Sequence, residues 1–302
     1  AEQRQVYDAQ LDHNLLVVAG PGSGKTHVLL ARLLRLVHVE HVAPRKILVL
    51  AFTRAVVSEL QHRLRDYSQR LGYNTLARDV RIRTFHSFAM SVLRESGEVV
   101  APSENVISQV VGHLRSHPQT HRTLSDRFDF VFVDEYQDVH GDRQKLLTQL
   151  TFGPTSSASQ RSQARILAVG DDDQSIFEYD NVDKAMDPVK RMEEFERQFH
   201  ATKITLTTNF RSTQQIIDAN QKYLTPMRGR IKSKERLVTA RIGHLGIVHE
   251  KPAGSKLVDV LSETRELLRT IPPTQRRRRH SPSGSEVIDN TIAVLGRTNA
   301  DV

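Results

Sequence analysis

The sequence contains no cysteine and no long uninterrupted apolar run. Without cysteine there is neither a disulfide nor a thiolate metal site, so nothing in the composition indicates an oxidising compartment. No apolar run approaches the about 20 residues of a membrane-spanning helix, and the opening AEQRQVYDAQ lacks the apolar core of a signal peptide. These absences predict a soluble, cytoplasmic protein with no membrane partner.

Acidic side chains are outnumbered by basic ones. Lys and Arg total 43 against 35 Asp and Glu, which gives a formal net charge of +8. An excess of positive charge favours an anionic partner, with nucleic acid as the first candidate, and says nothing about the fold. The length of 302 residues exceeds what one compact core usually covers, so we expect two domains, or one domain and part of another.

Six short apolar segments alternate with longer amphipathic ones. They are LLVVAG (15–20), KILVLAF (46–52), VRIRTF (80–85), FDFVFVDE (128–135), RILAVG (165–170) and KITLTTN (203–209). This alternation predicts an α/β fold, a parallel sheet with helices on both faces. Such sheets bind ligands at the carboxyl ends of their strands. The Ser/Gln-rich segment 153–163 and the Pro/Arg-rich segment 272–285 are predicted to be loops.

AGPGSGKT, at 19–26, follows one predicted strand and precedes a helical segment. Glycines let backbone N–H groups approach phosphate oxygens, the lysine reaches the β- and γ-phosphates, and the hydroxyl binds Mg²⁺. Ala19 stands where the strict pattern has glycine. The alternative is a glycine turn with a solvated lysine. The predicted nucleotide-binding residues here are Ala19, Gly20, Pro21, Gly22, Ser23, Gly24, Lys25, Thr26 and His27.

VFVDEYQD, at 131–138, ends a predicted buried strand on two adjacent acids. In proteins with a phosphate loop of this type, such an aspartate holds Mg²⁺ and a neighbouring carboxylate orients or deprotonates the attacking water. Asp134, together with Thr26, is therefore the predicted metal ligand, and Glu135 the predicted catalytic base. Acidic residues at strand ends are also common turn formers, which is the structural alternative.

Six motifs in this order resemble those of the UvrD/Rep-like superfamily 1 DNA helicases: AGPGSGKT, LAFTRAVVSEL, RTFHSFA, VDEYQD, GDDDQSIF and TTNFRST. EQRQV near the start is similar to the family's adenine-reading Q motif. The resemblance covers nearly the whole chain. It implies a RecA-like P-loop NTPase that uses ATP and Mg²⁺ and couples hydrolysis to 3′–5′ movement on single-stranded DNA, in DNA repair.

The resemblance also implies roles for single residues. Gln3 would read the adenine edge and Phe210 would stack on the base. Gln174 would sense the γ-phosphate or its attacking water. Arg211 would approach the γ-phosphate from a second motor domain and stabilise the charge that develops there, unless it forms a surface ion pair. With Lys25 and Glu135, Gln174 and Arg211 complete the predicted catalytic residues.

On the DNA side, Thr53, Arg54 and His86 fall where the family contacts the strand backbone. Phe177 and Tyr179 would stack on bases, which suits single-stranded DNA because every base has a π-face. Phe177 and Tyr179 could instead be core residues on one face of a strand, and His86 could cap or pack a helix. The implied partners are single-stranded or 3′-tailed duplex DNA and accessory repair or recombination proteins. The aspartates at 171–173 are interpreted as a polar turn.

Three positions depart from the family pattern: His27 replaces an arginine, Arg54 an asparagine, and Asp180 an arginine beside the proposed strand path. Residues 87–133 are too few for the family's large 1B subdomain. The chain also ends before the family's motifs V and VI. We therefore expect residues 1–202 to form the ATP-binding motor domain with a much reduced 1B, and residues 203–302 to begin a second, incomplete motor domain.

Two other function classes remain open. One is a nucleic-acid-binding or regulatory module with a relic ATP site, suggested by the missing motifs and by Asp180. The other is a P-loop GTPase or small-molecule kinase. The second is disfavoured because the chain contains no NKxD guanine motif and because a kinase does not need the motifs that follow the phosphate loop.

Overall fold

The structure is a computed structural model that describes residues 2–72, 76–98, 105–154, 164–174, 188–224, 237–240, 278–280 and 286–288. The chain divides into two compact units, Ala1–Ile247 and Val248–Val302. No helix in the described part of the chain is long and apolar enough to span a membrane.

A six-stranded sheet organises the first unit. Its order is β3-β2-β4-β5-β1-β6, and every neighbouring pair is parallel. The strands are β1 (Leu15–Ala19), β2 (Ile47–Ala51), β3 (Arg81–Thr84), β4 (Phe130–Val133), β5 (Arg165–Gly170) and β6 (Thr202–Leu206). Five lie within one of the six apolar segments and β6 begins one residue before its segment, so the predicted parallel sheet is confirmed.

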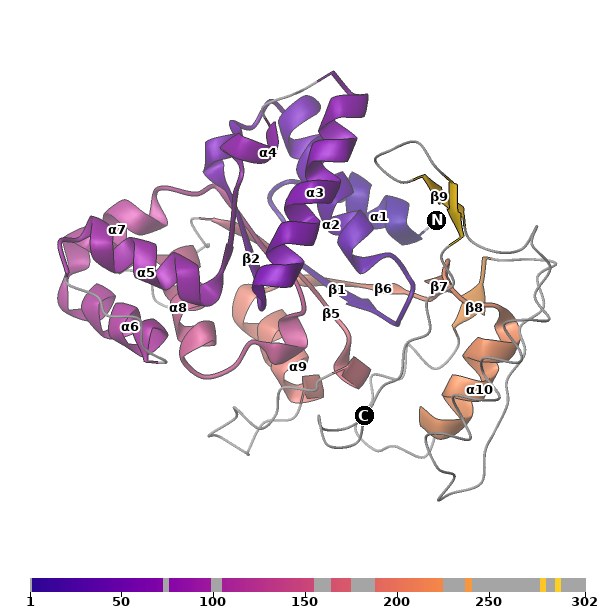
Figure 1. Cartoon of the computed structure of the whole chain (residues 1–302). Helices are drawn as coiled ribbons and strands as arrows, with labels where there is room; N and C mark the ends of the chain where they lie inside the picture. The colour runs from indigo at the N-terminus through magenta and orange to yellow at the C-terminus, as the bar shows by residue number, and fades with distance from the viewer. Residues whose placement is uncertain are drawn as a thin grey trace. The chain divides into compact units, whose positions relative to one another are not determined.

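Helices cover both faces of this sheet (Figure 1). One face carries α1 (Glu2–Asp8), α2 (Lys25–His38), α3 (Arg54–Arg70) and α4 (Leu76–Asp79). The other carries α5 (Phe85–Glu95), α6 (Val106–Ser116), α7 (Pro118–Ser125), α8 (Asp142–Phe152) and α9 (Pro188–Phe199). Short 3₁₀ turns lie at η1 (Pro44–Lys46), η2 (Tyr136–Asp138) and η3 (Asp172–Gln174).

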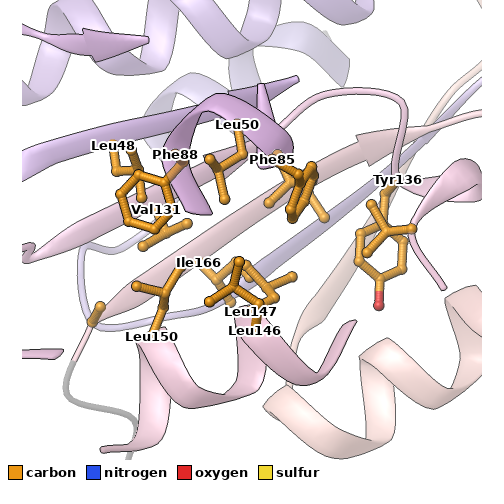
Figure 2. Close-up of a cluster of buried hydrophobic side chains, with 14 of the residues drawn as sticks. Leu48, Leu50, Phe85, Phe88, Val131, Tyr136, Leu146, Leu147, Leu150 and Ile166 are labelled. Carbon is orange, nitrogen blue, oxygen red and sulfur yellow. The ribbon is translucent and has the colours of Figure 1, made fainter. Parts of the chain in front are cut away.

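Strand β1 shows why both faces are covered. All five of its residues are buried, and alternate side chains belong to different cores, Leu15 and Val17 to one, Leu16 and Val18 to the other. A strand alternates its side chains between the two faces, so a fully apolar strand needs packing on each side. Figure 2 shows the second core, in which side chains of the sheet meet those of α5 and α8.

Three helices begin almost directly after strands, at the edge where the strands end. Thr84 caps α5: its Oγ1 accepts from the Ser87 N–H at 3.1 Å, and the Ser87 Oγ accepts from the Thr84 N–H at 3.1 Å. Thr53 caps α3 by accepting from the Val56 N–H at 3.3 Å. Helix α2 starts after Gly24 without a side-chain cap. The strand ends and helix starts therefore cluster at one edge of the sheet.

The remaining described elements are short. In the first unit, β7 (Thr208–Asn209) pairs in parallel with β8 (Val238–Thr239), and α10 (Gln214–Leu224) lies between them in sequence. In the second unit, β9 (Arg278–His280) pairs antiparallel with β10 (Glu286–Ile288). The prediction of a loop over 272–285 is therefore wrong at 278–280, where the backbone pairs across a short connection.

The predicted domain boundary, between 202 and 203, falls within β6. This strand pairs with β1 along its whole length, from Thr202 opposite Leu15 to Leu206 opposite Ala19. The strand itself therefore belongs to the first sheet. The assignment of the following residues to a second motor domain stays a prediction.

Asn14, just before β1, links β5 and the end of α9 at the opposite edge of the sheet. Its Nδ2 donates to the Phe199 carbonyl at 2.6 Å, and its Oδ1 accepts from the Ile166 N–H at 3.0 Å. Both contacts are buried. Replacing Asn14 by alanine leaves two buried backbone groups without a partner, so we expect the free energy of unfolding to fall by roughly 2–4 kcal/mol.

Urea denaturation followed by circular dichroism measures this change. The matched control is Asn105→Ala, because Asn105 is exposed before α6 and its side chain makes no capping hydrogen bond. Equal stabilities of the two variants would contradict the structural role of Asn14.

Candidate nucleotide-binding site

The glycine loop between β1 and α2 has a backbone that only glycine adopts easily. Gly22 and Gly24 have φ of 71° and 89°. A Cβ at Gly22 would lie 2.8 Å from the Asn209 Nδ2, and one at Gly24 would lie 2.6 Å from the Gln3 Nε2. The Ser23 hydroxyl donates to the Gly20 carbonyl at 2.6 Å and closes the turn. The loop therefore presents backbone N–H groups and the uncapped start of α2, which is the arrangement that binds phosphate.

The segment after β6 is held against this loop by Asn209. Its Nδ2 donates to the Pro21 carbonyl at 2.6 Å, and its Oδ1 accepts from the Arg211 N–H at 2.8 Å. The Phe210 N–H donates to the Gly22 carbonyl at 2.9 Å. These bonds bring Phe210 and Arg211 to the glycine loop. The motif TTNFRST does not by itself predict this role of its asparagine.

Helix α1 joins the same assembly. The Gln3 Nε2 donates to the Ser23 carbonyl at 2.8 Å, and the Glu2 carboxylate accepts from the Thr207 N–H at 2.7 Å. Glu2 therefore ties α1 to the segment that carries Phe210 and Arg211. Gln3 contacts the backbone of the loop at Ser23.

Asp134 and Glu135 follow β4 directly. Asp134 is buried, and its Oδ1 accepts from the Glu135 N–H at 3.0 Å. Burial first, and then the adjacent Glu135 carboxylate, raise the pKa of Asp134 to about 7. Glu135 itself has a φ of 51°, a left-handed backbone that is uncommon for a residue other than glycine and that clusters at functional sites.

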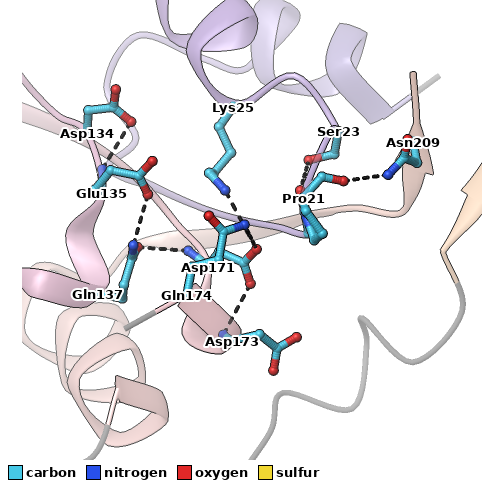
Figure 3. Close-up of polar contacts among 11 residues, drawn as sticks. Pro21, Ser23, Lys25, Asp134, Glu135, Gln137, Asp171, Asp173, Gln174 and Asn209 are labelled. Carbon is cyan, nitrogen blue, oxygen red and sulfur yellow. Dashed lines mark hydrogen bonds and ion pairs between the residues drawn. The ribbon is translucent and has the colours of Figure 1, made fainter. Parts of the chain in front are cut away.

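Gln137 connects the ends of β4 and β5. Its Nε2 donates to the Glu135 Oε2 at 2.9 Å, and its Oε1 accepts from the Asp171 N–H at 2.9 Å (Figure 3). Gln137 is buried, and its bond to Asp171 is shielded from water. It fixes the direction of the Glu135 carboxylate, a role that the sequence analysis did not assign.

Asp171 is fully buried at the end of β5 and faces the glycine loop. The Lys25 Nζ lies 3.6 Å from its Oδ2, and the Gln174 Nε2 donates to the same oxygen at 2.7 Å (Figure 3). The interpretation of 171–173 as a polar turn is therefore incomplete. The 3₁₀ turn η3 is present, but Asp171 also neutralises the lysine of the phosphate loop and positions Gln174.

These groups surround one cavity of about 340 Å³. Its lining is Gly20, Pro21, Gly22, Gly24, Lys25, Thr26, His27, Glu59, Arg63, Glu135, Gln174, Phe210 and Arg211. Four of these residues, Lys25, Glu135, Gln174 and Arg211, are the predicted catalytic residues. The structure brings them together from four separate segments of the chain.

Glu59 and Arg63 were not predicted to lie here. They lie one turn apart on α3, and the Arg63 Nη2 forms an ion pair with the Glu59 Oε1 at 2.5 Å. Their spacing of four residues predicts a shared helix face, but the sequence does not say which neighbour that face meets. Arg63 adds a guanidinium to the cavity wall.

The first 200 residues match the family described as the UvrD/REP helicase N-terminal domain, over residues 1–110 and 103–200. The chain belongs to this family. The ATP-dependent DNA helicase PcrA of Leuconostoc citreum is 24% identical over 73% of this chain and 38% of its own length. PcrA of Bacillus subtilis is 25% identical over 69% of this chain and 37% of its own length.

DNA helicase IV of Escherichia coli is 38% identical over 33% of this UvrD/REP-family chain and 13% of its own length. Among solved structures, the Pif1 helicase of Candida albicans superposes with a TM-score of 0.46 and 17% identity, over 90% of this chain and 54% of that one. The chain thus spans less than half the length of the PcrA relatives.

Some predicted nucleotide residues of this UvrD/REP chain stand behind the cavity wall. Gln3, Ala19 and Ser23 are absent from the described lining, as is Asp134, a predicted metal ligand. Ala19 and Ser23 are fully buried under the loop. His27 lines the cavity, and its Nδ1 lies 3.2 Å from the Tyr67 hydroxyl of α3.

The predicted DNA contacts have mixed placements. The Thr53 hydroxyl caps α3, and Arg54 is exposed at the first turn of that helix. His86 is half-buried in the first turn of α5, whose cap is the Thr84–Ser87 pair, so the capping alternative for His86 is wrong. Phe177 and Tyr179 lie outside the described residues.

The donor set fits a magnesium ion. Mg²⁺ is usually bound by one or two carboxylates together with substrate phosphates and waters, so a cage made only of protein is not required. The described residues hold no cluster of three or more His, Cys, Asp or Glu that could bind a metal alone. The buried Asp134 carboxylate beside Glu135 concentrates negative charge that a dication would offset. Thr26, in the cavity lining, supplies the hydroxyl.

The raised pKa of Asp134 predicts a pH dependence of stability. Since the pKa of about 7 in the folded chain exceeds the ordinary 3.8, this group's contribution is present below about pH 4 and is lost as pH rises through 7. Asp134→Asn removes the charge. We expect the variant's free energy of unfolding, relative to the parent, to increase by roughly 2–3 kcal/mol between pH 5 and pH 8 without Mg²⁺.

Urea titrations at the two pH values measure this difference. Asp129→Asn is the matched control, because Asp129 is an exposed carboxylate whose ion-pair partner, Lys46, is a lysine and not a histidine. A difference between Asp134→Asn and the parent that does not change with pH would contradict the burial of a titrating carboxylate.

Proposed function

We propose that this chain is the ATP-binding part of an ATP-dependent DNA helicase or translocase that moves 3′–5′ along single-stranded DNA. The observation that carries the proposal is the cavity in which Lys25, Glu135, Gln174 and Arg211 converge beside the glycine loop. The names of the PcrA relatives, which are ATP-dependent DNA helicases, support the substrate class.

In the proposed reaction the loop N–H groups and Lys25 bind the phosphates of ATP. Lys25 then exchanges Asp171 for a phosphate oxygen. Glu135, held by Gln137 at 2.9 Å, orients the water that attacks the γ-phosphate. Mg²⁺, held through Asp134 and Thr26, supplies charge neutralisation at the phosphate oxygens when bound.

Arg211 and Gln174 complete the proposed site from two other walls. The Arg211 N–H donates to the Asn209 Oδ1, and Asn209 in turn donates to the Pro21 carbonyl of the loop. We propose that the Arg211 guanidinium reaches the departing phosphate from this position. Gln174 bonds to Asp171 and immediately precedes the segment with Phe177 and Tyr179. We propose that this connection relates the state of the γ-phosphate to the stacking of DNA bases.

The proposed DNA contacts lie at one edge of the sheet. Thr53, Arg54 and His86 follow β2 and β3, at the edge where β4 and β5 present their acids. The formal charge of +8 favours a polyanion. Single-stranded DNA, alone or as the tail of a 3′-tailed duplex, is the proposed substrate, with repair or recombination proteins as accessory partners.

Release of phosphate from ATP, with and without oligo-dT, tests the proposed function. Glu135→Gln should keep nucleotide affinity and reduce turnover by about 10²-fold or more, because only the water-orienting charge is removed. Lys25→Ala should instead weaken nucleotide binding at least about tenfold. The matched controls Glu98→Gln and Lys203→Ala alter exposed residues outside the cavity and should behave as the parent.

The same assay separates the proposal from a nucleic-acid-binding module with a relic ATP site. That alternative predicts DNA binding without strand-stimulated turnover. Unchanged turnover in Glu135→Gln would refute the assigned role of this carboxylate.

Arg54 provides a test of the DNA path. If its guanidinium neutralises a backbone phosphate, Arg54→Ala should weaken binding of oligo-dT and reduce the slope of log K against log salt by about 0.7. The control Arg70→Ala removes an exposed arginine from the opposite end of the same helix and should leave the slope unchanged. Fluorescence anisotropy over a salt series measures both. Equal slopes in the two variants would contradict this path.

A further inference from the structure

A second cavity, of about 430 Å³, lies between α8 and α9 and is bordered by the last turn of α6. Three cations, Arg115, Lys145 and Arg191, line it against one carboxylate, Glu194. Among the described residues, its lining shares no member with that of the nucleotide cavity. None of the predicted functional residues lies in it.

Arg191, in the first turn of α9, is the unusual member of this wall. Only 2% of the residue is exposed, and its Nη1 donates to the Gln137 carbonyl at 2.8 Å. Its Nε and Nη2 are buried and have no hydrogen-bond partner in the part of the chain that the structure describes. A buried charged group with unused donors is unfavourable unless an acceptor is supplied. An anionic ligand would supply it once the guanidinium turned into the cavity that Arg191 lines.

The rest of the lining suits an organic phosphate. The Gln198 Nε2 donates to the Thr148 Oγ1 at 2.9 Å, and the Gln144 Nε2 lies 3.4 Å from the Gln198 Oε1. These linked polar groups offer donors and acceptors beside the cations. Lys145 is paired with Asp142 at 2.8 Å, but its side chain is 53% exposed, so the exchange of that partner for a ligand costs little.

We propose that this cavity binds a nucleotide through its phosphate, with Arg191, Lys145 and Arg115 as the cations and the glutamine amides facing the sugar or base. Guanidinium groups match the oxygens of phosphate in geometry and charge. The cavity, of about 430 Å³, is within the range of sites that bind small organic ligands. The ligand is either a free nucleotide or one unit of a DNA strand, and both present the same phosphate chemistry.

Isothermal titration calorimetry with thymidine 5′-monophosphate tests the site. The Lys25→Ala background weakens phosphate binding in the first cavity, so the remaining signal reports the second. In that background we expect Arg191→Gln to raise Kd about tenfold or more, and Lys145→Gln about threefold. The matched control is Arg197→Gln on the same helix, whose side chain is 80% exposed and outside the lining, and which should leave Kd unchanged.

The outcomes are distinct. If oligo-dT binds more tightly than the monophosphate and shows the same dependence on Arg191, the site takes a strand; if it does not, the site takes a free nucleotide. Absence of binding overturns the proposal. So does an equal Kd in the background protein and in its Arg191→Gln and Lys145→Gln variants.

If thermal melts show that Arg191→Gln is unfolded, the double variant Arg115→Gln/Lys145→Gln decides, because both side chains lie near the surface. Since hydrolysis is not measured, failure of the proposed ATPase would leave this result standing.

Discussion

The main constraint on this site is the burial of two carboxylates at the ends of neighbouring parallel strands. They are Asp134, after β4, and Asp171, after β5. A carboxylate away from water requires a cation or hydrogen-bond donors. Asp171 has both, in Lys25 and Gln174. Asp134 has the backbone N–H of Glu135, and its pKa rises to about 7. The site thus has one acid neutralised by protein and one that a dication would neutralise.

The parallel sheet brings these acids together with the glycine loop. Strand β1 lies beside β5, and β5 lies beside β4, so the loop after β1 is adjacent to Asp171, and Asp171 to Gln137. Strand β6 on the other side of β1 delivers Asn209 to the same loop. Each predicted catalytic side chain therefore follows the end of a strand, and hydrogen bonds of backbone and amide groups hold the segments in place.

The positions of the strands, of the glycine loop and of the acidic residues could be predicted from the sequence. Hydrophobic periodicity and local turn chemistry determine them. It was insufficient for Gln137, Asn209 and the Glu59–Arg63 pair. Their roles depend on which strand or helix lies next to theirs, and one sequence does not reveal that. The loop prediction at 278–280 was wrong for a related reason. A run of arginines predicts solvent-exposed side chains, but it does not indicate whether the backbone pairs with another strand.

Gln137 lies between the two cavities and contacts one lining residue of each. Its backbone carbonyl accepts from Arg191, and its side-chain amide donates to Glu135. One buried residue therefore holds both the cation of the second cavity and the carboxylate of the first. A phosphate that draws the Arg191 guanidinium away from that carbonyl would loosen the 3₁₀ turn η2 that Gln137 belongs to. Because binding linkage is reciprocal, nucleotide in the first cavity would then alter affinity in the second by the same factor.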